Sequence, residues 1–354
     1  MKKITVVLLA LIVLLASCAG KETFELALIT DIGTIDDKSF NQGSWEGLAQ
    51  YAKEHDITHK YYQPAEKSDD AYLTAIDLAV RGGAKLVVTP GFLFETSVFI
   101  AQDRYPNVYF VLIDGVPHSK DYQTFRTGDN TVGVQYAEDQ AGFLAGYAAV
   151  KDGNRRLGFA GGMAVPPVIR FGYGFVQGAE YAASELGLAS GQVTINYHYT
   201  GGFEATPEVQ TLAASWFNSG IDVIFACGGA VGSSVMAAAE QTGKKVIGVD
   251  VDQSIESPTV ITSAMKGLQS SVYACVADFY AGEFPGGQTL VFSAENDGVG
   301  LPMASSKFQT FSRADYDAIY NKLADGIIPR IENLNSDGSP SVVPVSITRV
   351  TEIR

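Results

Sequence analysis

The chain has 354 residues, of which 46% are hydrophobic, 11% aromatic and 18% charged, and its formal net charge is −14. This is the composition of a globular protein, and the length predicts about two domains. The acidic balance disfavours nucleic-acid binding, because it repels phosphate backbones and no basic stripe interleaved with aromatic residues occurs.

The N-terminus has the pattern of a lipoprotein signal sequence. Two lysines precede an apolar run over 4–15, which is short for a membrane-spanning helix of about 20 residues. The run continues into Leu-Ala-Ser-Cys, a lipobox in which the Cys18 thiol receives a diacylglycerol. We therefore expect a signal peptide over 1–17 and a lipidated tether over 18–23, which anchors the protein outside the cytoplasm. The alternatives are a plain secretory signal or a single transmembrane anchor.

Beyond the tether, short apolar runs alternate with helical patterns, which is typical of parallel sheets covered on both faces. The runs that predict strands are 24–30, 85–91, 108–115, 156–162, 193–199, 222–229, 245–252 and 260–262. The segments that predict helices are 41–55, 69–82, 94–104, 137–151, 168–186 and 207–218.

A weak internal repeat predicts two similar doubly wound lobes. In the first half, Gly83 precedes a strand ending at Gly91, eight residues on, and Asp114 ends a strand 23 residues later. Glycines at positions 220 and 228 and an aspartate at 250 repeat this pattern, with spacings of 8 and 22 residues.

The two lobes are expected to share the chain in separate segments. We expect a first lobe over 24–135 plus about 264–300, and a second over about 136–263 plus 301–354. In open parallel sheets, ligands bind outside the carboxyl ends of strands. A ligand cleft between the lobes is therefore expected.

The first strand leads into the motif DIGTIDDKSFNQ. Asp31 ends the strand with its carboxylate directed at the cleft. Asp37 or Ser39 is expected to cap the helix that follows, and Phe40 either enters the core or stacks on a ligand.

A second aromatic residue is predicted on the opposite wall. Phe203 follows a glycine pair in a loop, which is a poor place for a core residue and a good place for stacking on a flat ligand. Two aromatic faces can hold a heterocycle between them, each contributing about 1 kcal/mol beyond the area that it buries.

A lysine in an apolar segment predicts a polar part of the site. Lys266 needs a partner, and Asp250, at the end of another strand, is the natural candidate. Together a carboxylate and an ammonium can bind adjacent sugar hydroxyls. The alternative is a structural salt bridge at a domain crossing.

Cysteine and histidine patterns favour neither a disulfide nor a metal site, and a disulfide between the two remaining cysteines of an exported protein is the alternative. Cys227 and Cys275 lie in apolar settings and are expected to be small buried side chains. The four histidines are dispersed, and His55 and His59 are expected on the solvated face of a helix end. No cofactor is expected.

The segments TDIGTIDDKSFNQGSWEGL, VIGVDVDQS and TSAMKG resemble the basic membrane protein family of bacterial lipoproteins, in its purine nucleoside receptor branch. The resemblance covers nearly the whole chain and implies a type I periplasmic-binding-protein fold with a nucleoside in the interlobe cleft. It also implies ligand contacts at eight positions. These are Asp31 and Asn41 at the base, Asp114 as a further polar contact, Phe40 and Phe203 as stacking rings, Asp250 and Lys266 at the ribose, and the glycine turn at Gly229.

The resemblance implies a binding protein and not an enzyme. The expected ligand is adenosine, guanosine or inosine, and the expected partners are a permease and an ATPase of an ABC transporter. A monomer is expected. Riboflavin, a sugar or a signalling role on the same fold are the alternatives. A nucleoside hydrolase is disfavoured, because the first motif lacks the second aspartate and the proline of the calcium site of those enzymes.

Overall fold

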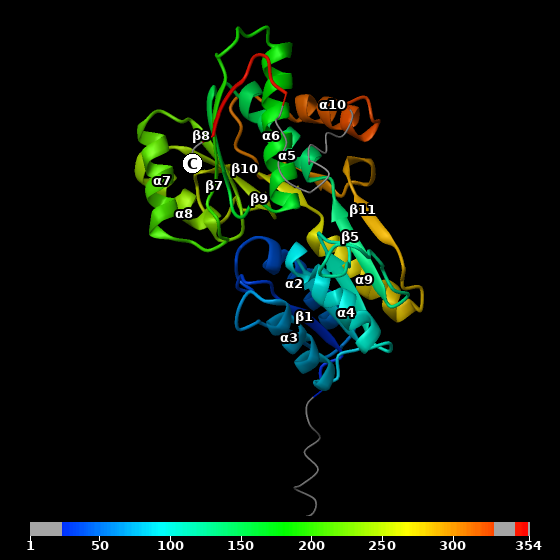
Figure 1. Cartoon of the computed structure of the whole chain (residues 1–354). Helices are drawn as coiled ribbons and strands as arrows, with labels where there is room; N and C mark the ends of the chain where they lie inside the picture. Colours follow the sequence, from blue (N-terminus) through cyan, green and yellow to red (C-terminus); the bar gives the residue numbers. More distant parts are fainter. Residues whose placement is uncertain (1–22, 329–343, 353–354) are drawn as a thin grey trace, which may run out of the picture.

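The computed structural model describes residues 23–328 and 344–352, so the expected signal peptide and Cys18 lie outside the described residues. The chain forms two α/β lobes, each built on one largely parallel sheet (Figure 1). This confirms the expected type I periplasmic-binding-protein architecture of two doubly wound lobes.

The first lobe has a six-stranded parallel sheet. Its order is β11 (Thr289–Phe292), β5 (Thr131–Tyr136), β4 (Tyr109–Ile113), β3 (Leu86–Pro90), β1 (Leu26–Ile29) and β2 (His59–Tyr62). Its helices are α2 (Phe40–Glu54), α3 (Asp69–Arg81), α4 (Glu95–Arg104) and α9 (Leu268–Ala281), with the 3₁₀ turn η1 (Phe92–Phe94) before α4. Successive residues of β1 enter the hydrophobic clusters on opposite faces of the sheet, as the alternation of side chains in a strand requires.

The second lobe has a seven-stranded sheet. Its order is β12 (Val299–Gly300), β10 (Val260–Lys266), β9 (Lys245–Asp250), β8 (Val223–Cys227), β6 (Arg156–Gly161), β7 (Thr194–Tyr199) and β13 (Arg349–Glu352), with β12 antiparallel to β10. Its helices are α5 (Glu138–Lys151), α6 (Pro166–Glu185), α7 (Pro207–Asn218), α8 (Val231–Thr242) and α10 (Arg313–Ala324). The 3₁₀ turn η2 (Ala294–Asn296) lies between β11 and β12.

Within the described residues the chain passes between the sheets three times, after β5, after β10 and after β11. The expected crossing near 264 falls inside β10, which belongs to the second sheet through Lys266. The predicted strand over 260–262 is thus only the first part of β10, because all seven of its residues pair with β9 or β12 or extend between those pairs.

The histidine pair does not share a helix end. Helix α2 ends at Glu54, and His59 instead begins β2, where its ring lies 5.4 Å from that of Trp45. The apolar settings of Cys227 and Cys275 did predict their state, since both are buried free thiols.

The internal repeat appears in the backbone angles. Gly83 and Gly220 have φ values of 103° and 101°, and Asp114 and Asp250 have φ values of 61° and 67°. A left-handed conformation costs about 1–3 kcal/mol for a residue with a Cβ. Each lobe therefore has a strained backbone at the same point, where a strand ends and an aspartate faces the space between the lobes.

Helices α5 and α6 approach closely through glycines on both helices. Gly142 and Gly146 of α5 face the backbone of α6, and Gly174 and Gly178 of α6 face the backbone of α5. A Cβ atom on any of the four would overlap with a backbone carbonyl oxygen of the other helix. Close backbone contact thus holds α5, which is almost wholly buried, against α6.

We expect Gly146→Ala to lower the free energy of unfolding by about 3 kcal/mol, because the added methyl group forces the two helices apart. Urea unfolding followed by circular dichroism measures the change. Gly232→Ala in α8 is the matched control: its Cβ meets nothing closer than 3.6 Å, so we expect no loss of stability there. Equal stability of the two variants would contradict the close-packing account.

Candidate ligand-binding site

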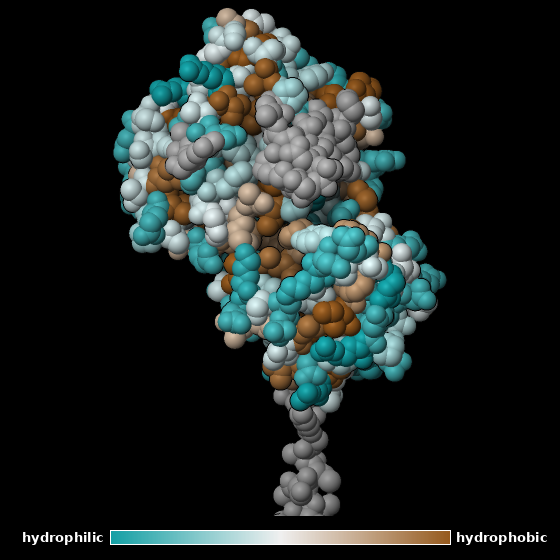
Figure 2. Space-filling model, in the orientation of Figure 1, coloured by the Kyte–Doolittle hydropathy of each residue, from teal (hydrophilic) through white to brown (hydrophobic). Residues whose placement is uncertain are grey.

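A cavity of about 240 Å³ lies between the lobes. Figure 2 shows apolar side chains gathered where the lobes meet. The first lobe contributes the β1–α2 turn, the β3–η1 turn and the end of β4, and the second contributes the start of α6, a loop around 203–205 and the ends of β8, β9 and β10. All eight residues predicted at the site line this one cavity: Asp31, Phe40, Asn41, Asp114, Phe203, Gly229, Asp250 and Lys266.

Asp31 is buried at the carboxyl end of β1 and accepts hydrogen bonds through one oxygen. Its Oδ1 accepts from the Gly33 N–H at 2.6 Å and from Asn41 Nδ2 at 2.9 Å, while Asn41 Oδ1 accepts from the Asp31 N–H at 3.2 Å. Burial raises the pKa of Asp31 to about 6, against the opposing effect of these hydrogen bonds. Asn41 therefore holds Asp31 in place through both ends of its amide.

The start of helix α2 separates the roles of Asp37 and Ser39. Asp37 accepts from the N–H groups of Ser39, Asn41 and Gln42 at 2.9, 2.9 and 3.1 Å, so it satisfies the free donors of the first turn. Ser39 makes no capping bond with its side chain. Its hydroxyl instead donates to Asp250 Oδ2 of the second lobe at 2.6 Å.

Phe40 and Phe203 come from opposite lobes and are both half-buried. The Lys266 ammonium lies 4.9 Å from the centre of the Phe40 ring, within the range of a cation–π contact. Phe203 lies against Gly162, where a Cβ atom would overlap with its ring, and close to Gly228. The glycines after β6 and β8 thus leave the space that the Phe203 ring fills.

Gly229 lies at the carboxyl end of β8 with a φ of 54°. A Cβ there would come within 3.3 Å of the Phe203 carbonyl oxygen. The turn is therefore tight and directly beside the aromatic loop, and its backbone faces the cavity.

The main partner of Lys266 is not Asp250, as expected, but Asp114. Lys266 Nζ donates to Asp114 Oδ2 and lies 3.1 Å from Glu138 Oε1, whereas its distance to Asp250 Oδ1 is 4.0 Å. The reason is positional: β4 and β10 both direct their carboxyl ends at the junction of the lobes, and Ser39 already bonds Asp250.

The neighbouring carboxyl groups keep Lys266 charged, whereas burial disfavours the ionisation of Asp114. Burial alone would lower the pKa of Lys266, but Asp114, Glu138 and Asp250 outweigh it and raise that pKa above its ordinary value. Burial raises the pKa of Asp114 to about 7 even though Lys266 lowers it. Asp114 Oδ1 is buried and has no hydrogen-bond partner within the described part of the chain, so it can accept from a ligand.

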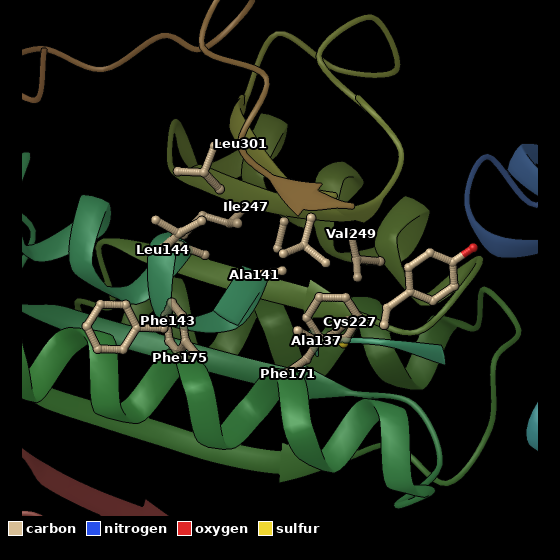
Figure 3. Close-up of a cluster of buried hydrophobic side chains, with 14 of the residues drawn as sticks. Ala137, Ala141, Phe143, Leu144, Phe171, Phe175, Cys227, Ile247, Val249 and Leu301 are labelled. Atoms are coloured by element: carbon tan, nitrogen blue, oxygen red, sulfur yellow. The ribbon is translucent and has the colours of Figure 1, made fainter. Parts of the chain in front are cut away.

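Sequence reasoning missed several residues around the cavity. Phe171 and Cys227 line its second-lobe wall with Val249, and Figure 3 shows all three in the same apolar cluster. Glu138 and Arg170 form an ion pair at 2.6 Å beside Lys266. The signal that found Lys266, a charge within an apolar segment, applies equally to Arg170 in α6.

The residues that the structure describes provide neither a metal site nor a membrane-spanning helix. No group of three or more histidine, cysteine, aspartate or glutamate residues is arranged there to hold a metal ion. No helix among them is long and apolar enough to cross a bilayer.

Residues 24–336 match the family model described as ABC transporter substrate-binding protein PnrA-like. The chain belongs to this family. It is 30% identical to the ABC transporter nucleoside-binding protein BmpA of Lactococcus lactis, over 90% of this chain and 97% of that protein. It is 29% identical to basic membrane protein D of Borreliella burgdorferi, over 91% of each. A solute-binding protein of an ABC transporter system from Aeropyrum pernix has the same fold, with a TM-score of 0.75 and 22% identity over 89% of this chain and 95% of that one.

As a member of the PnrA-like family, the chain is a solute-binding component of an ABC transporter and not an enzyme. Such proteins work outside the cytoplasm. The cavity between the two lobes is the place where such a protein would enclose its solute.

The raised pKa of Asp31 predicts that ionisation of its carboxyl group lowers the free energy of unfolding at pH values above that pKa. The folded state prefers the protonated acid, so its contribution to stability is complete below the unfolded pKa near 4 and is lost as the pH rises through about 6. We expect Asp31→Asn to raise the free energy of unfolding at pH 8, by up to about 3 kcal/mol, and to have a much smaller effect at pH 4. Calorimetric unfolding at the two pH values measures this. Asp36→Asn, in the same turn but exposed, is the control and should show no such gain; a gain independent of pH would contradict the account.

Proposed function

We propose that this protein captures a purine nucleoside, adenosine, guanosine or inosine, in the interlobe cavity and presents it to the permease and ATPase of an ABC transporter. In this proposal a lipid on Cys18 anchors it to the outer face of the membrane. The observation that carries the proposal is the pair of phenylalanines, Phe40 and Phe203, on opposite walls of a cavity that also holds two separate polar groups.

The first polar group suits the edge of a base. Asp31 uses Oδ1 for Gly33 and Asn41, and within the described residues no hydrogen bond involves its Oδ2. That oxygen is available to accept from an N–H of a heterocycle lying between the two rings. A desolvated carboxylate is a strong acceptor for such a donor.

The second polar group suits a sugar. Asp114 and Asp250 each place a carboxylate acceptor within 4.0 Å of the Lys266 ammonium donor. Vicinal hydroxyls can donate to one group and accept from another at the same time. An aromatic clamp beside such a cluster fits a flat base joined to a ribose better than a free sugar.

The size of the cavity also favours a nucleoside. Its volume of about 240 Å³ is below the range of about 300–1,000 Å³ for sites that take drug-sized ligands. Riboflavin, with three fused rings, is a poorer fit than a purine. The Lactococcus lactis relative, named as a nucleoside-binding protein, supports the same assignment.

Closure of the lobes provides the mechanism. A ligand that contacts both lobes binds the closed form better than the open one and shifts the population towards it. Phe40 with Asp31 on one lobe and Phe203 with Lys266 on the other provide this differential binding. The closed pair of lobes is then what the transporter recognises.

Calorimetric titration tests the function directly, with the soluble protein that begins after Cys18 and is shown by mass spectrometry to carry no ligand. The titrants are adenosine, guanosine, inosine, uridine, riboflavin and ribose. We expect tight binding of purine nucleosides, with no free base released on prolonged incubation. Binding of ribose or riboflavin in preference to all nucleosides would contradict the proposal.

The aromatic clamp gives a mutational prediction. We expect Phe203→Ala to lower affinity for a purine nucleoside by about tenfold or more, since it removes both stacking and buried apolar area. Phe203→Tyr keeps the ring and should retain most of the affinity. Phe125→Ala, an exposed aromatic outside the cavity lining, is the control and should bind as the unaltered protein does. Loss of affinity in Phe125→Ala equal to that in Phe203→Ala would argue against a clamp.

A further inference from the structure

Two charged side chains outside the cavity lining form an ion pair with each other, and one of them, Glu138, lies beside the lysine within the cavity. Glu138 is the first residue of α5 and its side chain is fully buried, and Arg170, near the start of α6, is 14% exposed. Arg170 Nε donates to Glu138 Oε2 at 2.6 Å, and Glu138 Oε1 lies 3.1 Å from Lys266 Nζ. A chain of charges therefore runs from α6 into the cavity and ends at Asp114.

We propose that Glu138, held by Arg170, is the positioning residue of this site, which fixes the Lys266 ammonium so that one of its N–H groups is directed at the sugar hydroxyls of the nucleoside. The inference rests on the proposed function, because it assigns the residue that orients the ribose-binding lysine. Glu138 does not itself touch the ligand.

The number of donors on the ammonium supports this role. A lysine ammonium has three N–H groups on a flexible stem. Asp114 accepts one, and the Glu138 carboxylate forms an ion pair with the ammonium at 3.1 Å from outside the cavity, with geometry that makes no hydrogen bond to Glu138 Oε1. Asp250, at 4.0 Å, is beyond hydrogen-bond reach, so among the described residues the other two donors of the ammonium have no hydrogen-bond acceptor. A ligand hydroxyl beside Asp250 is the partner that this arrangement lacks.

The contribution of Glu138 is one of position more than of charge. Asp114 and Asp250 already place two carboxyl groups near the single positive charge of Lys266. Burial opposes the ionisation of Glu138, but Arg170 and Lys266 outweigh it and hold its pKa below the ordinary value. The opposite charges of Glu138 and Arg170 thus cancel. The pair contributes to the site by holding the Lys266 ammonium in a fixed direction.

The positions of Glu138 and Lys266 along the chain explain why the site needs Glu138. Glu138 comes directly after the first crossing between the lobes, and Lys266 comes directly before the second. Both belong to the second lobe, whereas Asp114 belongs to the first. As the lobes separate, the contact with Asp114 is the one that lengthens, and Glu138 stays beside the lysine. The ligand therefore meets a donor that is already oriented, which reduces the entropic cost of binding.

The test compares two ligands that differ only in their sugar hydroxyls, adenosine and 2′,3′-dideoxyadenosine. Glu138→Gln keeps the shape of the side chain and removes its charge. We expect it to lower the affinity for adenosine by about tenfold and to leave that for the dideoxynucleoside unchanged, so that the ratio of the two affinities falls by about tenfold. A loss of structural support alone would lower both affinities by the same factor and leave the ratio as it was.

Further variants keep the test decisive. Glu138→Asp retains the charge at a shorter reach and should recover part of the ratio. Glu185→Gln removes another glutamate of the second lobe, one that pairs with Lys151 at 3.5 Å and is absent from the cavity lining, and it should keep the full ratio. If Glu138→Gln does not fold, Arg170→Lys, which loses the hydrogen bond from Nε, is measured in the same way and should also lower the ratio.

The outcomes separate this inference from the proposed function. The positioning role would be overturned if Glu138→Gln, or Arg170→Lys where that variant is used, kept the ratio of adenosine affinity to dideoxyadenosine affinity of the unaltered protein. Absence of adenosine binding in the unaltered protein would instead overturn the proposed function.

Discussion

The buried ammonium of Lys266 is the constraint on which the site depends. Taking such a charge out of water costs several kcal/mol, and only close carboxylates with good geometry offset this cost. Here they come from three places: Asp114 from the first lobe, Glu138 from the start of α5, and Asp250 from the strand beside β10. Asp114 belongs to the first lobe and Lys266 to the second. The pairing of their charges therefore fixes the distance between the two lobes at the inner end of the cavity.

The aromatic part of the site depends on glycine in a comparable way. Phe203 occupies space that a side chain at position 162 would fill, and Gly229 accommodates a tight turn beside it. The two requirements differ in kind: the polar end of the cavity is set by charge pairing over long sequence distances, and the apolar end by local backbone clearance. A single cavity with an apolar clamp and a polar cluster results.

These two kinds of requirement also explain what the sequence could and could not predict. The rule that ligands lie at the carboxyl ends of strands, with the repeated glycine and aspartate positions, was enough to bring Asp31, Asp114 and Asp250 to one cavity. It could not say that Lys266 would bond Asp114, because that pairing joins residues 152 positions apart on different sheets. Glu138 was missed because it begins a helix, where an acidic residue is ordinary. Strands β2, β11, β12 and β13 were missed too, since they are short or lie at sheet edges, and the four residues of β2 are all at least partly exposed.

The hydrogen bond from Ser39 to Asp250 has a consequence for release of the solute. It joins the lobes through protein groups alone, as does the bond from Gln253 Nε2 to the Lys38 carbonyl oxygen at 2.8 Å. Part of the free energy that holds the lobes together is therefore independent of what lies between them. These two bonds hold the lobes together whether or not a solute is bound, so they slow the opening of the lobes and with it the exit of whatever the cavity encloses.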